Sequence, residues 1–418
     1  MTAHRHTGHG HGRHSHEGDD ILPARTRRVL LLVTVPAFVL TIVGMVLLRP
    51  TGAPDVSEAV ELPSDLVDGT VVGMTPSVCP GLEGGEPTCR TVRVRLTSGP
   101  DSGEIVSFEA TDTSVILTLE VGDEIVLSHT GNNADDFAYD FADRQRRVPM
   151  AVLALLFAAM VVALGRWRGL AALVGFGISL AVLIQFTLPA ILAGRSPLAV
   201  AIVSSSAIMF VALYMAHGVS ARTTTAVLGT LLSLTITGIL ALLFVEAARL
   251  SGFASEEAIF VKVAAEQLNL QGLLLGGIII GSLGVLDDVT VTQASAVWEL
   301  HRANPEMGAR NLYRSAIRIG RDHIASTVNT LVLAYAGASL PLLVLFTIAG
   351  PGLANVLNGE VVAEEVVRTL VGSIGLVASV PITTALAVLV VGGRHTGAPA
   401  VPAPVTSPAP DRDFWEEE

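Results

Sequence analysis

The sequence predicts an α-helical polytopic membrane protein with about eight transmembrane helices and a small extracytoplasmic all-β domain. Composition, long apolar runs and one alternating polar stretch support this fold class. Half of the 418 residues are hydrophobic and only 15% are charged, with a mean hydropathy of +0.59. Soluble domains carry about 25% charged residues, so the composition argues against a cytosolic enzyme. The net charge of −12 argues against nucleic acid as a partner, because phosphate binding needs a basic surface.

Eight segments are apolar over the roughly 20 residues that a bilayer-spanning helix needs. The first, 28–48, is too long for a signal-peptide core and no A-x-A cleavage site follows it, so we expect a retained anchor. The other seven make up the expected membrane domain, 148–392. Their expected limits are about 148–165, 169–192, 197–216, 223–248, 270–290, 325–349 and 369–392.

The distribution of arginines predicts that both termini lie in the cytoplasm. Cytoplasmic loops are enriched in basic residues, and this orientation gives the cytoplasm the arginine-rich loop from Arg302 to Arg321. Arg144, Arg146 and Arg147 fall on the outer side, but they follow a large loop that translocates as a domain, where the rule has less force. We therefore expect a multi-pass membrane protein with the polar segment 50–147 on the outer side.

The polar segment 50–147 is expected to form the outer domain. Residues 91–96 alternate with a period of two, residues 97–103 are rich in turn formers, and further strand patterns follow. Four or five short strands indicate a small antiparallel barrel, similar to an OB-fold, a shape that does not by itself define a function. The segment contains 18 Asp and Glu residues against 6 Arg, so the net charge of the whole chain comes from this domain.

The two cysteines and the two terminal segments carry further predictions. Cys79 and Cys89 are ten positions apart in the outer domain and are expected to form a disulfide, with a metal-binding pair as the weaker alternative. Residues 1–27 and 393–418 are expected to be disordered, the latter rich in Pro and Ala and acidic at its end. Neutral imidazoles in the first tail have the chemistry to bind a divalent metal, or to do so adventitiously; they are His4, His6, His9, His11, His14 and His16.

A polar stripe in the sixth predicted span carries the main site hypothesis. Asp288, Thr292, Ser295 and Glu299 are spaced four, three and four residues apart, which places them on one helix face. Carboxylates at membrane depth are costly and usually functional, although solvated aspartates that merely end the span are the alternative. Asp288 is preferred to Asp287 because it heads this face.

The seventh predicted span offers a partner for the stripe. Asn329 and Thr330 lie in an otherwise apolar segment, where such residues either coordinate a solute or hydrogen-bond a neighbouring helix. Arg321 and Asp322 precede them and are assigned structural roles. No nucleophile elbow, Walker loop, zincin motif or dinucleotide fingerprint is present, so we expect no enzyme activity and no resident cofactor.

Residues from about 139 to 392 resemble the YibE/F family of bacterial multi-spanning membrane proteins. The resemblance rests on several runs together, of which Ile319-Gly320-Arg321-Asp322-His323-Ile324 is the most specific. Further runs are Gly165-Arg166-Trp167-Arg168-Gly169-Leu170, Asn329-Thr330-Leu331, Ala334-Tyr335-Ala336-Gly337, Leu340-Pro341-Leu342-Leu343 and the stretch 367–376.

The resemblance implies an integral membrane protein whose biochemical activity is not well established. It carries over Asp288, Ser295, Glu299, Arg321, Asp322 and Asn329 as recurring polar positions. The segment 286–293 departs from many members, because Asp287, Thr290, Thr292 and Gln293 add polarity where small apolar residues are usual.

These observations lead to two functional hypotheses. The first is a permease or exporter of a small solute or ion, driven by protons, with Asp288 as the switchable carboxylate, Glu299 as a relay and Asn329 and Thr330 as coordinating groups. The second is a non-transporting envelope sensor or scaffold whose outer domain binds a partner protein. The expected partners are the lipid bilayer, an unknown small solute or ion, and a second copy or an envelope protein.

Overall fold

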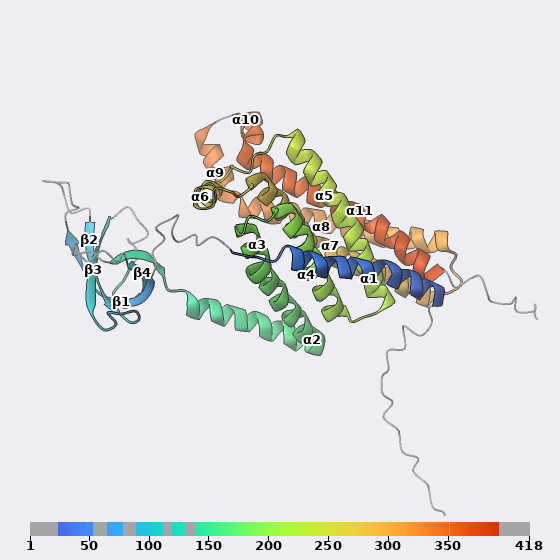
Figure 1. The fold of residues 1–418 in the computed structure, drawn as a ribbon, viewed down its shortest axis with the longest axis horizontal. Helices are drawn as coiled ribbons and strands as arrows, with labels where there is room; N and C mark the ends of the chain where they lie inside the picture. Colours follow the sequence, from blue (N-terminus) through green and yellow to red (C-terminus); the bar gives the residue numbers. More distant parts are fainter. Residues whose placement is uncertain are drawn as a thin grey trace, which may run out of the picture.

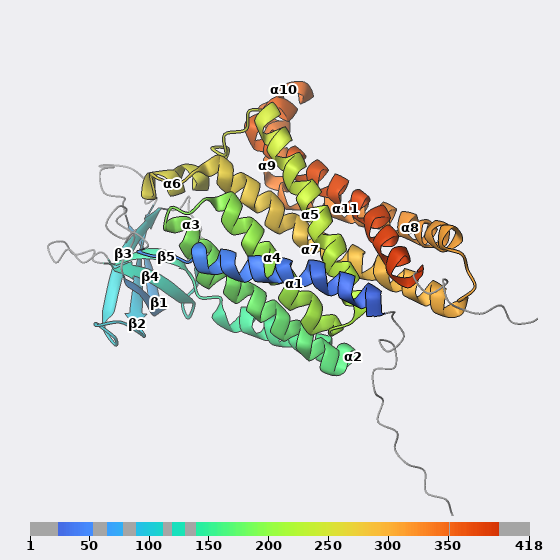
Figure 2. The same cartoon turned by 45° about the vertical axis from the view of Figure 1, so that its right-hand side comes forward.

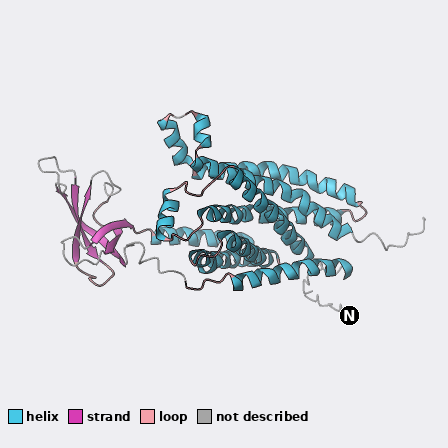
Figure 3. Cartoon of the chain, turned by 45° about the horizontal axis from the view of Figure 1, so that its top comes forward, coloured by secondary structure: helices cyan, strands magenta, loops and turns pink. Residues whose placement is uncertain are grey.

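The chain folds into a helical bundle with a small β-sheet at one end (Figures 1 and 3). The computed structural model describes residues 24–52, 65–77, 89–111, 119–129, 139–350 and 352–392. The six N-terminal histidines, Cys79 and the segment 393–418 lie outside these residues. Mostly helical structure with one antiparallel sheet agrees with the predicted fold class at this level.

Four of the described helices, α4 to α7, begin at a residue whose side chain caps the helix. Ser220 Oγ, for example, accepts a hydrogen bond of 3.1 Å from Thr223 N at the start of a helix, and Asn269 caps another through Gly272 N. The described helices are α1 (Ala24–Leu47), α2 (Arg147–Val182), the π-helical turn η3 (Leu183–Thr187), α3 (Leu188–Leu192), α4 (Pro197–His217), α5 (Ala221–Ala247), α6 (Glu256–Ala264), α7 (Leu270–Ala303), α8 (Ala309–Ala338), α9 (Leu340–Ala349), α10 (Leu353–Asn358) and α11 (Glu360–Gly392).

Six of the described helical runs are long and apolar enough to cross a membrane: α1, α2 with its continuation to Leu192, α4, α5, α7 and α11. The α8–α9 pair, bent by 61°, makes seven if it is counted as one span. The predicted number of eight is reached only when the two arms of α2 are counted separately, so eight stays a prediction.

The two arms of α2 meet at a sharp turn. Arg166 has φ 50° and ψ −132°, which is not helical, and Figures 1 and 2 show the chain reversing its direction there. Gly169 follows the turn so closely that a Cβ atom at this position would overlap the Val161 carbonyl oxygen. The run Gly165–Leu170 therefore forms the tip of a helical hairpin.

The bundle is built around α4, α5, α7 and α11. Their facing side chains form one buried apolar cluster that includes Met209, Val227, Leu286 and Leu376, each at most 1% exposed. The first arm of α2, in contrast, has no buried residue in its apolar window, as expected for a helix that faces lipid. Helix α1 lies across α4 and α5 (Figure 2).

The outer segment forms a five-stranded antiparallel sheet with the strand order β3-β2-β1-β4-β5. In β2 the side chains of Val92, Val94 and Leu96 are buried and alternate with polar neighbours, which confirms the period-two pattern over residues 91–96. The strands are β1 (Asp65–Ser77), β2 (Cys89–Leu96), β3 (Ile105–Thr111), β4 (Glu124–His129) and β5 (Tyr139–Arg144).

The described strands do not close into a barrel, so the expected OB-like barrel is not confirmed. The edge strands β3 and β5 lie near each other but are not neighbours in the hydrogen-bonded order. They meet through side chains instead, since the Phe108 and Phe141 rings stack with their centroids 6.1 Å apart. The alternating pattern correctly places the strands, but it does not specify whether edge strands pair, because pairing depends on sheet coiling.

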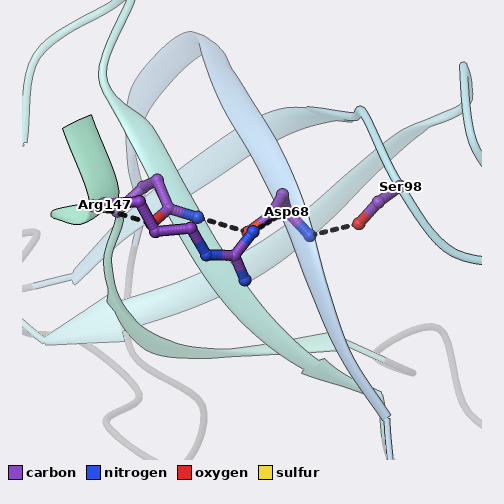
Figure 4. Close-up of polar contacts among 4 residues, drawn as sticks. Asp68, Ser98 and Arg147 are labelled. Atoms are coloured by element: carbon purple, nitrogen blue, oxygen red, sulfur yellow. Dashed lines mark hydrogen bonds and ion pairs between the residues drawn. The ribbon is translucent and has the colours of Figure 1, made fainter. Parts of the chain in front are cut away.

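Asp68 of β1 attaches the sheet to the start of α2 (Figure 4). Its Oδ2 lies 3.1 Å from Arg147 Nη1, and its Oδ1 accepts a hydrogen bond of 2.6 Å from Gln145 Nε2. The Asp68 N–H also donates to Ser98 Oγ at 2.7 Å. The Asp68 side chain thus links strand β1 of the outer sheet to Gln145 and to Arg147, the first residue of α2.

Candidate functional site

A seam of buried hydroxyl groups runs between α5, α7 and α11. These three helices pack directly against one another, and buried Ser, Thr and Gln side chains lie among the apolar residues of their contact faces. Each of these side chains is at most 8% exposed. They are Thr230, Ser233 and Thr237 of α5, Ser282, Thr290 and Gln293 of α7, and Ser373, Ser379, Thr383 and Thr384 of α11.

Glycines bring the three helices close enough to form the seam. A Cβ atom on Gly229 of α5 would overlap Thr383 of α11, and one on Gly375 of α11 would overlap Thr237 of α5. Each glycine therefore receives a threonine from the facing helix. This reciprocal fit sets the register of α5 against α11 and holds the hydroxyls at the centre of the bundle.

Asp287 of α7 lies at the seam with one oxygen unsatisfied. Its neighbour Thr230 of α5 makes a hydrogen bond of 2.7 Å with Thr290 of α7, and Thr290 also donates to the Asp287 main-chain oxygen at 3.1 Å. The carboxylate oxygen Oδ1 is buried and has no hydrogen-bond partner within the described residues. An unsatisfied buried carboxylate oxygen is costly, so this atom is suited to receive a proton or a cation.

Gln293 of α7 hydrogen-bonds both α8 and α11. Its Nε2 donates to Ala316 O of α8 at 2.9 Å and to Thr384 Oγ1 of α11 at 2.7 Å. Gly320 of α8 packs against the same amide, because a Cβ there would lie 2.8 Å from Gln293 Oε1. Gln293 thus joins α7, α8 and α11 at one point.

The predicted stripe on α7 lies on a different face from the seam. Asp288 heads it and its side chain is 76% exposed, with Oδ2 3.9 Å from His323 Nε2 of α8. Thr292 and Glu299 are exposed as well, and Ser295 is partly buried. Glu299 is bound by Arg302 at 3.1 Å, in the adjacent turn of the same helix.

The predicted partners on α8 do not meet Asp288 directly. Asn329 and Thr330 are exposed, and Thr330 Oγ1 donates to the main-chain oxygen of Ser326 in its own helix at 3.0 Å. Arg321 and Asp322 are exposed too. The α8 side chain that the structure brings to Asp288 is His323, which the spacing argument did not select.

A second polar cluster lies nearer the other end of the bundle, between α7, α8 and α11. Arg368 Nε is 3.6 Å from Glu365 Oε1, one turn earlier in α11. The Arg368 guanidinium and the Tyr335 hydroxyl lie against Gly277 and Gly281 of α7, where a Cβ would stand 3.8 Å and 3.5 Å from them. The glycines of α7 therefore leave space for a guanidinium and a phenol inside the bundle.

Metal binding is not supported by any cluster in the described part of the chain, which holds no group of three His, Cys, Asp or Glu side chains. Cys89 begins β2, is 2% exposed and is not a free thiol. Its predicted partner Cys79 and the histidine tail are outside the described residues, so the disulfide and the tail metal site stay predictions.

The residues that sequence reasoning missed carry a readable signal. Thr230, Ser233 and Thr237 recur at three- and four-residue intervals on α5, as do Ser379 and Thr383 on α11. Hydroxyls at helical spacing on two apolar spans indicate a shared buried face. Combined with Asp287, that pattern points to the seam more directly than the stripe below Asp288.

These features define a multi-pass membrane protein with a polar interior and a small extramembrane sheet. A family model described as YibE/F-like protein matches residues 153–393. Because the match spans more than half of the chain, the chain belongs to the YibE/F-like family, as the sequence resemblance predicted. No curated protein and no solved structure matches it.

Proposed function

We propose that the chain is a proton-coupled permease or exporter of a small solute or ion, whose path follows the seam between α5, α7 and α11. One observation carries the proposal: the buried Oδ1 of Asp287, unpartnered within the described residues, next to the hydrogen-bonded hydroxyls of Thr230 and Thr290. Ionisable residues within membrane spans commonly mark ion and proton pathways. Hydroxyls suit such a path because each one both donates and accepts hydrogen bonds.

The proposal assigns Asp287 the role that the spacing argument gave to Asp288. Asp288 is the next residue along α7 and stands beside His323 at the exposed margin of the bundle. In this scheme, Asp288 and His323 exchange protons with solvent, and Asp287 binds the transported proton or cation. In this scheme, opening of the path requires Thr383 and Thr237 to leave the positions against Gly229 and Gly375 in which they pack.

The proposed setting is the bacterial plasma membrane with both termini in the cytoplasm. Arginines at the start of α1, at the end of α7 and in the first half of α8 support this orientation through the positive-inside rule. The sheet between α1 and α2 then lies outside the cell, and the Asp288–His323 margin lies nearer the cytoplasm.

Solute-dependent proton movement in proteoliposomes tests the proposal. The full chain is reconstituted with a pH-sensitive dye inside, and amino acids, small carboxylic acids and monovalent and divalent cations are added one at a time. We expect at least one class to trigger proton movement, and Asp287→Asn to abolish it while Asp288→Asn slows it. Flux that persists in Asp287→Asn, or a fully silent panel with folded protein, would contradict the proposal.

The sensor or scaffold hypothesis is retained because of one observation, the attachment of the sheet to α2 through Asp68. This link gives a partner bound to the sheet a direct route to a membrane helix. The hypothesis predicts that deleting residues 55–140 removes a cellular phenotype that Asp287→Asn leaves intact. The permease proposal predicts the opposite pattern for Asp287→Asn.

A further inference from the structure

An apolar groove lies on the side of the bundle away from the outer sheet, between α1, α5 and α11. It has a volume of about 520 Å³ and is lined by the first two turns of α1, by residues 228–235 of α5 and by residues 386–390 of α11. In Figure 2, the beginning of α1 lies near the end of α11. A volume of this size lies within the range of ligand sites.

A second hollow adjoins the groove along α5. This apolar hollow of about 330 Å³ lies between α4, α5 and α7, and it shares Leu231 and Thr235 with the first. Together they follow α5 from Leu228 to Leu242. At 1.5 Å per residue this is roughly 21 Å, whereas one leaflet of the hydrocarbon core is about 15 Å thick. The groove is thus long enough for a full acyl chain.

The mouth of the groove carries positive charge. Arg25 lines it and is exposed, one turn before the apolar residues of α1 begin. The α5 and α11 segments that line the groove contain no acidic residue. An arginine above an apolar slot matches a molecule with an anionic head and an apolar tail, because guanidinium pairs with phosphate oxygens in a bidentate manner.

We propose that this groove is a specific site for an anionic phospholipid, which places one acyl chain along α5 and its phosphate at Arg25. The lipid comes from the leaflet at the Arg25 end of α1 and fills the space between α1 and α11. Charge complementarity at the mouth selects this occupant over a zwitterionic lipid, whose headgroup brings a positive charge to Arg25. The site is independent of the path proposed along the seam.

Native mass spectrometry of the purified full chain, titrated with phosphatidylglycerol or phosphatidylcholine, tests the site. We expect phosphatidylglycerol to bind more tightly, and Arg25→Gln to weaken it by about five- to tenfold, the value of one arginine near an anionic headgroup. Arg25→Lys should restore most of the affinity. Arg27→Gln is the matched control, since Arg27 is also exposed but does not line the groove.

A bulky side chain that fills the groove provides a second test, which does not depend on charge. Leu232 lines the groove, whereas Leu243 is exposed on the same helix outside both hollows. Leu232→Trp should reduce binding of both lipids, and Leu243→Trp should leave it unchanged. Equal binding of the two lipids to the wild type, or equal effects of Arg25→Gln and Arg27→Gln, would overturn the proposal. A large gain of lipid binding on deleting residues 393–418 would overturn it too, because the chain itself would then occupy the groove.

Discussion

Two adjacent aspartates on α7 occupy different environments. Successive residues of an α-helix are rotated by about 100°, so Asp287 turns toward Thr230 of α5 while Asp288 turns toward His323 of α8. The first has a buried oxygen without a partner among the described residues, and the second is 76% exposed. This difference makes Asp287 the candidate for binding a proton or cation within the bundle, and Asp288 a group in exchange with solvent.

In the outer sheet, a buried phenol is expected to make stability depend on pH. Tyr139 is 4% exposed and donates a hydrogen bond of 2.5 Å to Asp101 Oδ2. Burial first, and then the Asp101 carboxylate, raise the pKa of Tyr139 to about 12. Because the pKa in the folded state exceeds the ordinary value of 10.0, this contribution to stability is present below about pH 10 and is lost as the pH rises toward 12.

Ultraviolet absorbance of tyrosinate measures this directly. One of the four tyrosines should titrate about two pH units above its usual value, and Tyr139→Phe should remove that component. At neutral pH the same substitution should destabilise the sheet by about 1 kcal/mol through the lost hydrogen bond. Identical titration curves for the wild type and Tyr139→Phe would contradict the assignment.

At the residue level, the spacing argument selects one face of α7, whereas the buried hydroxyls lie on another face of the same helix. The spacing of Asp288, Thr292, Ser295 and Glu299 correctly places them on one face of α7, yet that face is largely exposed. Spacing within one helix cannot show which side meets a neighbour. The side that meets a neighbour depends on where α5 and α11 pack. The intervals between the Ser and Thr residues of α5 and α11 indicate this better than the position of a carboxylate on α7.

Among the helices, close approach of α5 and α11 depends on individual glycines. Gly375→Ala should destabilise the bundle by about 1–3 kcal/mol, because the new Cβ would overlap Thr237 Oγ1 in a packed core. Gly284→Ala is the control, since a Cβ there meets no heavy atom within 4 Å among the described residues. Thermal or denaturant unfolding in micelles should separate the two variants. Equal tolerance of both would argue against the packing described here.

The sequence predicts where the membrane helices lie better than where they bend or end. Apolar runs locate the spans, and the turn near Arg166 falls between two predicted segments. Hydropathy does not show the bend of 61° between α8 and α9 or the extension of α7 to Ala303, because it locates apolar runs and not the bends or polar ends of helices. The strands are predicted because alternation shows which side chains face the sheet core. Closure into a barrel is not predicted, because it depends on how the sheet twists and coils.

Across the whole molecule, negative charge and the candidate path occupy different parts. Residues 50–147 contain 18 acidic residues and 6 arginines, and the rest of the chain has equal numbers of acidic and basic residues. The acidic sheet lies at one end of the bundle (Figure 3), and Asp68 fixes it to α2. An acidic surface attracts cations electrostatically, so in the permease account this domain concentrates positively charged solutes at one end of the path.

The central claim is that the seam between α5, α7 and α11 is a path that opens, and not only a packing surface. Thr383 provides the most direct test, because it is fully buried in the seam and its hydroxyl has no partner in the part of the chain that is described. Labelling of Thr383→Cys by a membrane-impermeant maleimide is measured in proteoliposomes with and without a proton gradient. Exposed Val219→Cys provides the positive control and the wild-type chain the blank.

The account predicts that the gradient changes the labelling rate of Thr383→Cys, that Asp287→Asn removes this change, and that Val219→Cys reacts equally in all conditions. A Thr383→Cys protein that stays unreactive with and without the gradient, while Val219→Cys is labelled, would contradict it and leave the seam as a static helix interface.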